Sequence, residues 1–147
     1  MKKGHWYKQI IGRIDQSIEK EYYFEAAFIC YGIIEDRLDS ILRILNQTPS
    51  RGVKAKITKI SKCRSTKLEK QFSLGKWDGG KYVDRGLLER VLLWGELYRN
   101  PMQHMLGDPK AYKATIGNFH SDLTKDLAVE GRDVIRKLSA AVMRFKK

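Results

Sequence analysis

The residues best suited to chemistry lie in one short stretch, YRNPMQHML, at the end of an apolar helical pattern. Pro101 lacks an amide hydrogen and disfavours a helical conformation at the preceding residue, so the helix is predicted to end or kink at Asn100. Asn100 also suits the N-cap of a new helix, with proline at its first position. In an unbroken helix Arg99 and His104 would point about 140° apart. The break is therefore what allows the two side chains to converge.

An arginine and a histidine beside a helix start suit the cleavage of phosphodiester bonds in RNA. The free amides and positive dipole end of a new helix favour a nearby anion. Histidine moves a proton near neutral pH, and arginine stabilises the extra negative charge on a phosphorus approaching five-coordination. If the ribose 2′-hydroxyl attacks the neighbouring phosphate, no metal or other cofactor is needed. The sequence also offers no compact His/Cys/Asp/Glu cluster with metal-ligand spacing. Arg99 and His104 are thus predicted to be the catalytic pair of a metal-independent endoribonuclease.

Apolar spacing predicts the helices that position this stretch. Residues 19–47 carry apolar side chains every three or four positions and are predicted to form one long amphipathic helix. A shorter helix with a charged outer face is predicted in the basic stretch, where Val53, Ile57 and Ile60 recur at helical spacing. A third helix, with Trp94 in the core, runs from about Asp84 into the motif, and Ser121 is predicted to cap a last amphipathic helix.

No strand pattern of useful length appears, although the DGG turn at residues 78–80 predicts either a loop or a short hairpin. The fold class predicted from these elements is all-α, a compact bundle of four to five helices. The length of 147 residues fits a single domain over 1–147. Two cysteines indicate neither a disulfide framework nor a zinc site, and Cys30 is expected to be a buried free thiol.

The formal net charge of +12 is unevenly distributed. Eight basic residues and one acid lie between Arg51 and Lys70, and six basic residues and one acid lie between Arg132 and Lys147. Clustered positive charge attracts polyanions, so nucleic acid or an anionic surface is the first partner class to consider, and together with the motif RNA is the predicted partner. The alternative is a solvated basic face without a partner. The residues predicted to contact RNA are Arg51, Lys54, Lys56, Lys59, Lys62 and Arg64.

The N-terminal segment begins with positive charge but has no apolar stretch behind it, and no run reaches membrane-spanning length. A cytoplasmic protein without a membrane partner is therefore expected. Among the aromatic residues, Tyr22, Tyr23 and Phe24 either stack on RNA bases or pack in the core of the long helix.

The stretch RNPMQH, following an apolar helix, resembles the signature of HEPN-domain proteins: an arginine, usually followed by asparagine, and then a histidine after four to six intervening positions. The helix FEAAFICYGIIEDRLDSIL and the closing amphipathic helix are similar to helices of that fold. The resemblance implies an α-helical bundle, commonly a homodimer whose two motifs face a shared cleft. In active members it implies metal-independent endoribonuclease activity, often in toxins or antiphage effectors, with an antitoxin or another defence-system protein as partner.

Carried over to this sequence, the resemblance implies that Arg99 and His104 are catalytic, with Asn100 orienting them and Glu35 as a supporting polar group. Some toxin members carry a tyrosine two residues after the histidine that a partner enzyme modifies, and here that position is Leu106. Two other functions fit the same sequence. One is a non-catalytic RNA- or nucleotide-binding module of the same fold, and the other is a small docking subunit of a larger assembly.

Overall fold

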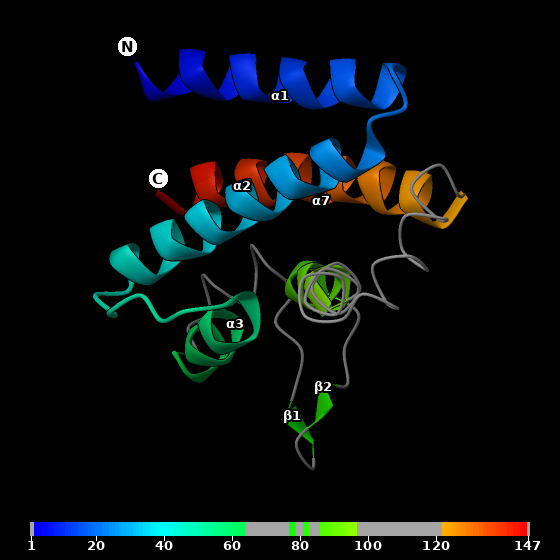
Figure 1. Cartoon of the computed structure of the whole chain (residues 1–147). Coiled ribbons are helices and arrows are strands. Elements are labelled where there is room, and N and C mark those ends of the chain that lie inside the picture. Colours follow the sequence, from blue (N-terminus) through cyan, green and yellow to red (C-terminus); the bar gives the residue numbers. More distant parts are fainter. Residues whose placement is uncertain (1, 64–76, 79–80, 83–85, 97–121, 147) are drawn as a thin grey trace. The chain divides into compact units, whose positions relative to one another are not determined.

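A computed structural model describes residues 2–63, 77–78, 81–82, 86–96 and 122–146 of the chain. Five helical segments occur within this described part, which confirms the predicted all-α class (Figure 1). The helices are α1 (Lys3–Glu19), α2 (Tyr23–Ile44), α3 (Val53–Lys62), an unlabelled helix over 87–96, and α7 (Asp122–Lys146).

Two short strands flank residues 79–80, which agrees with the hairpin, one of the two alternatives that the sequence left open. Strand β1 (Trp77–Asp78) pairs antiparallel with β2 (Lys81–Tyr82), with residue 77 opposite 82 and residue 78 opposite 81. The hairpin adds only these two-residue strands to a helical structure.

Two compact units make up the chain. The first comprises residues 1–32 and 96–133, and the second comprises 33–95 and 134–147. Both α2 and α7 contribute residues to each unit, because the boundaries fall inside these helices. The single domain expected over 1–147 stays a prediction.

The first unit contains α1, a helix that the sequence analysis did not identify. α1 buries Ile14 and Ser17, and the start of α2 contributes Tyr23, Ala26, Ala27 and Cys30 to the same small core. Glu21 separates the two helices, with a left-handed φ of 64°. The backbone N–H of Tyr22 donates a 2.7 Å hydrogen bond to the carbonyl of Ser17, closing the turn. The predicted long helix over 19–47 therefore begins later, at Tyr23.

The second unit holds the larger core, and here the predicted helices are confirmed. The apolar positions predicted for α3 are buried, as is Trp94 with an exposed fraction of 2%. Gly95 lies close to α3: a Cβ at this position would be 3.3 Å from Cγ1 of Val53. The buried apolar residues of this unit are Ile33, Ile34, Leu38, Ile41, Leu42, Val53, Ile57, Ile60, Leu88, Val91, Trp94, Val134, Ile135, Leu138, Ala141, Val142 and Phe145.

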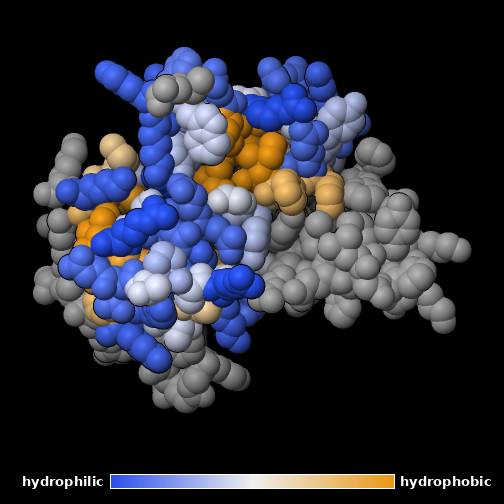
Figure 2. Space-filling view, turned by 60° about the vertical axis from the view of Figure 1, so that its left-hand side comes forward, coloured by the Kyte–Doolittle hydropathy of each residue, from blue (hydrophilic) through white to orange (hydrophobic). Residues whose placement is uncertain are grey.

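Among the helices of the described part, none is both long and apolar enough to cross a bilayer. Hydrophilic side chains cover much of the coloured surface on the face seen in Figure 2, with apolar side chains visible between them.

Candidate nucleic-acid interface

Charge is divided unequally between the two units. The sequence ranges of the first unit contain ten basic and ten acidic residues, whereas those of the second contain 19 basic and seven acidic residues. The second unit therefore carries the whole formal net charge of +12. A surface that gathers phosphate groups is expected in this unit rather than in the first.

The outer face of α3 presents several of the predicted RNA-contacting cations. Lys54 and Lys62 are exposed on this helix, and Arg51 is exposed two residues before its first residue. Lys59 is half-buried, and its Nζ donates a 2.7 Å hydrogen bond to the carbonyl of Thr48. The exposed cations can approach a polyanion without first being released from a buried ion pair.

Lys56 points inward, unlike the exposed lysines of α3. Its side chain is 6% exposed, and its Nζ lies 2.5 Å from Oδ1 of Asp39 on α2. The spacing explains this orientation, because residue 56 follows buried Val53 by three positions and precedes buried Ile60 by four. An ammonium held in this way neutralises Asp39 instead of facing solvent, so we leave Lys56 out of the proposed phosphate-contacting set.

A second group of cations surrounds an open pocket of about 330 Å³ in the same unit. Sequence reasoning missed this pocket, because Arg90 is far along the chain from the residues of α7 that it joins. The excess of basic residues after position 132 was the available signal, but it does not reveal which neighbour faces them. The described residues lining the pocket are Leu87, Arg90, Lys137, Ala140 and Arg144.

The first unit uses its charges differently. Nε of Arg132 donates to Oδ1 of Asp15, and Nη2 of Arg132 lies 3.1 Å from Oδ2 of the same carboxylate. The hydrogen bond to Asp15 raises the pKa of Arg132. Burial raises the pKa of the nearby Cys30 thiol to about 12, although the charge of Arg132 opposes the shift. Cys30 is a buried free thiol, as predicted.

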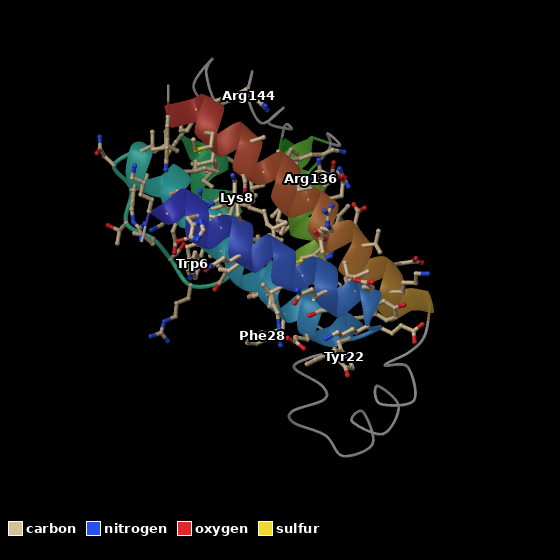
Figure 3. All side chains as sticks on the ribbon, turned by 90° about the horizontal axis from the view of Figure 1, so that it is seen from above. Trp6, Lys8, Tyr22, Phe28, Arg136 and Arg144 are labelled. Carbon is tan, nitrogen blue, oxygen red and sulfur yellow. The ribbon has the colours of Figure 1, made fainter. Side chains whose placement is uncertain are left out.

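Several exposed aromatic side chains lie among the described residues of the first unit. Trp6 and Tyr22 are 48% and 56% exposed, and Phe28 is 62% exposed (Figure 3). Of the aromatic residues considered for stacking on bases, Tyr22 is accessible, whereas Tyr23 is buried in the core with 7% exposure. Tyr23 thus packs in the core, Phe24 is half-buried, and Tyr22 is available to a partner.

The predicted catalytic residues Arg99, Asn100 and His104 lie outside the described residues, as does the RNA-contacting candidate Arg64. Glu35 lies on α2 and is half-buried. No group of three or more His, Cys, Asp or Glu side chains within the described ranges is placed to hold a metal ion. Comparison with protein-family models, with curated proteins and with solved structures gives no match, so the HEPN resemblance rests on the motif and the helical pattern of this chain.

Proposed function

We propose that this protein binds RNA through cations of the second unit and cleaves it without a metal, as a HEPN-type endoribonuclease. The unequal distribution of charged residues between the two units supports the RNA-binding part of the proposal. All of the net charge of +12 belongs to the second unit, where exposed cations occur on α3 and around the pocket. The all-α architecture is also the class that the family resemblance implies.

Phosphate contacts explain why such a surface suits RNA. Each cation that neutralises a backbone phosphate releases condensed counterions, which makes binding strong at low salt and steeply salt-dependent. Base identity contributes little to contacts of this kind, so α3 is expected to hold RNA with little sequence preference. Arg51, Lys54 and Lys62 are the α3-side cations proposed to make these contacts, because all three are exposed.

The proposed chemistry belongs to Arg99 and His104. His104 transfers a proton as general acid or base while the ribose 2′-hydroxyl attacks the adjacent phosphate, and Arg99 stabilises the charge that develops on phosphorus. The bond from phosphorus to the 5′-oxygen breaks, which leaves a 2′,3′-cyclic phosphate and a 5′-hydroxyl end. Asn100 is proposed to orient the pair, and Glu35 to support it.

The assembly and the biological role are proposals of the same kind. A homodimer that brings two RNPMQH motifs to one cleft should show about twice the chain mass of 17.1 kDa in light scattering at micromolar concentration. A cytoplasmic toxin or antiphage effector held in check by an antitoxin or another defence-system protein would fit this activity. Growth arrest on expression of the wild type, relieved in a His104→Ala variant, would support that role.

Cleavage of mixed RNA by the purified protein in the presence of a chelator tests the proposal directly. The expected products carry 2′,3′-cyclic phosphate ends. His104→Ala should lower the cleavage rate by about 100-fold or more, the usual contribution of a positioned proton-transfer group. His5→Ala is the matched control, because His5 is exposed on α1 and lies outside the motif, and its rate should match the wild type.

Binding measurements separate the catalytic proposal from the binding-only alternative. RNA affinity should survive His104→Ala, whereas Arg99→Ala should reduce both affinity and rate, since it removes a phosphate contact together with transition-state stabilisation. Salt-sensitive RNA binding without any cleavage by the wild type would instead establish the non-catalytic module. If the wild type neither binds nor cleaves RNA, the docking-subunit alternative takes precedence.

A further inference from the structure

The pocket in the second unit is formed by residues from two helices. Leu87 and Arg90 come from the helix over 87–96, and Lys137, Ala140 and Arg144 come from α7. The contributions from α7 are three and four positions apart, which puts them on one face of the helix. The pocket is open to solvent and has a volume of about 330 Å³.

Positive charge dominates the described lining. Arg90, Lys137 and Arg144 are cationic, and no acidic side chain is among the lining residues that the structure describes. All three also make polar or electrostatic contacts within the protein. A guanidinium has five N–H donors and an ammonium has three, so such contacts leave donors for an incoming anion.

We propose that this pocket binds the di- or triphosphate group of a nucleotide. A phosphodiester carries a single negative charge, whereas a terminal di- or triphosphate concentrates several charges in a small volume, which matches a pocket lined by three cations better. The two arginines suit bidentate contacts with phosphate oxygens, and the lysine adds a compact point charge.

The two uncharged lining residues leave room for this group. Ala140 is exposed and has the smallest side chain of the set, so it occupies little of the pocket on the side formed by α7. The site shares no residue with the α3 cations proposed to hold the RNA backbone, and it does not depend on Arg99 or His104. It can therefore be tested separately from the proposed cleavage.

Titration calorimetry with inorganic tripolyphosphate and the full-length protein tests the cations. Lys137→Ala and Arg144→Ala should each weaken binding by about tenfold or more, because each removes charge-assisted hydrogen bonds. Arg136→Ala is the matched control: it removes the same charge from an exposed position on α7 that is outside the described lining (Figure 3). Its affinity should change by less than about twofold, consistent with the weak effect of screened charges.

A second pair of variants tests the pocket without changing any charge. Ala140→Leu should fill the space and weaken tripolyphosphate binding by about tenfold or more, whereas Ala140→Ser should leave it open and bind like the wild type. Melting curves from circular dichroism should overlay for all these variants, since residues 136, 137, 140 and 144 are exposed.

Two sources could supply the phosphate group, a free nucleotide or the 5′ end of an RNA. Displacement of tripolyphosphate by ATP, with equal affinity for 5′-hydroxyl and 5′-triphosphate RNA, would assign the site to free nucleotides. Tighter binding of 5′-triphosphate RNA, lost in Arg144→Ala, would assign it to RNA ends.

Three results would overturn the proposal. They are no binding of tripolyphosphate by the wild type, equal losses for Arg136→Ala and Arg144→Ala, or wild-type affinity in Ala140→Leu. None of these results bears on cleavage of 5′-hydroxyl RNA, which reports the proposed function separately.

Discussion

The two units place their charged residues in contrasting ways. The first contains equal numbers of basic and acidic residues, ten of each, and joins Arg132 to Asp15 in a partly exposed ion pair. The second contains 19 basic and seven acidic residues, and its Lys56–Asp39 pair is more deeply buried. The count of lysines in a segment is therefore a poor guide to its binding surface. Burial decides which cations stabilise the fold and which remain accessible to a polyanion.

The largest expected contrast between the units is the reactivity of their cysteines. Cys30 of the first unit is buried with a pKa of about 12, compared with an ordinary value of 9.0, so its thiolate fraction near pH 8 is about a thousandfold lower than normal. Cys63 of the second unit is half-buried at the end of α3. A thiol-specific reagent at pH 8 should modify Cys63 readily and leave Cys30 largely unreacted in the folded protein.

Two controls accompany the thiol measurement. Both cysteines should react in denaturant, and Cys63→Ala should remove the fast phase from the folded protein. The folded state also holds the Cys30 proton more tightly than the unfolded chain, so the Cys30 contribution to stability is present below pH 9.0 and is lost as the pH rises toward about 12. Cys30→Ala should remove that part of the pH dependence. Comparable modification rates for the two folded thiols would contradict the assigned burial.

The ion pairs provide the next contrast, measured as the free energy of unfolding in urea. Lys56→Met should cost about 3 kcal/mol, because it leaves Asp39, only 22% exposed, without its cation. Arg132→Met should cost about 1 kcal/mol or less, since the side chains of Arg132 and Asp15 are 30% and 45% exposed.

The double variant Lys56→Met/Asp39→Leu identifies the source of the larger cost. It should recover most of the stability lost in Lys56→Met, because the unpaired carboxylate is removed as well. If Lys56→Met and Arg132→Met were equally destabilising, the two pairs would not differ in burial as the structure indicates.

RNA binding provides the smallest of the three contrasts. Reversing three exposed cations of the second unit should lower the slope of log affinity for single-stranded RNA against log salt by about 2.1 if each contacts one phosphate. Between 50 and 200 mM salt, this corresponds to about 20-fold less loss of affinity than in the wild type. The substitutions are Arg51→Glu, Lys54→Glu and Lys62→Glu.

A matched triple variant in the first unit controls for net charge. It reverses three exposed lysines and should leave the salt slope nearly unchanged. Equal slopes for the two triple variants would show that RNA responds to total charge and not to a surface of the second unit. The control substitutions are Lys2→Glu, Lys8→Glu and Lys20→Glu.

Much of the helical fold was predictable because apolar periodicity is a local property of the chain. Val53, Ile57 and Ile60 repeat at helical spacing, and all three are buried in α3. The first helix was missed because its segment was considered only as a targeting signal, although Ile10, Ile14 and Ile18 repeat every four residues within it. The boundary at residues 20–22 also depends on a left-handed turn that apolar spacing does not reveal.

The candidate interface was less predictable because it depends on contacts between distant segments. The sequence alone does not distinguish Lys56 from Lys54, since the burial of Lys56 depends on Asp39, 17 residues earlier on another helix. The pocket likewise joins Arg90 to residues more than 40 positions further along. The proposed catalytic motif rests on residue types and spacing alone, because its three polar residues lie outside the described part of the chain.

Gly95 allows two helices of the second unit to pack closely, and both helices carry cations. The helix over 87–96 meets α3 where Gly95 faces Val53, and an added methyl group would force Val53 to shift. The exposed lysines lie on α3, and Arg90 lies on the helix over 87–96. Moving the two helices apart would therefore change the distance between the α3 lysines, which are proposed to hold the RNA backbone, and Arg90 of the pocket that is proposed to bind a di- or triphosphate. The absence of a side chain at Gly95 thus lets the two helices pack closely in the interior, and this packing distance sets the spacing of the cations on the surface.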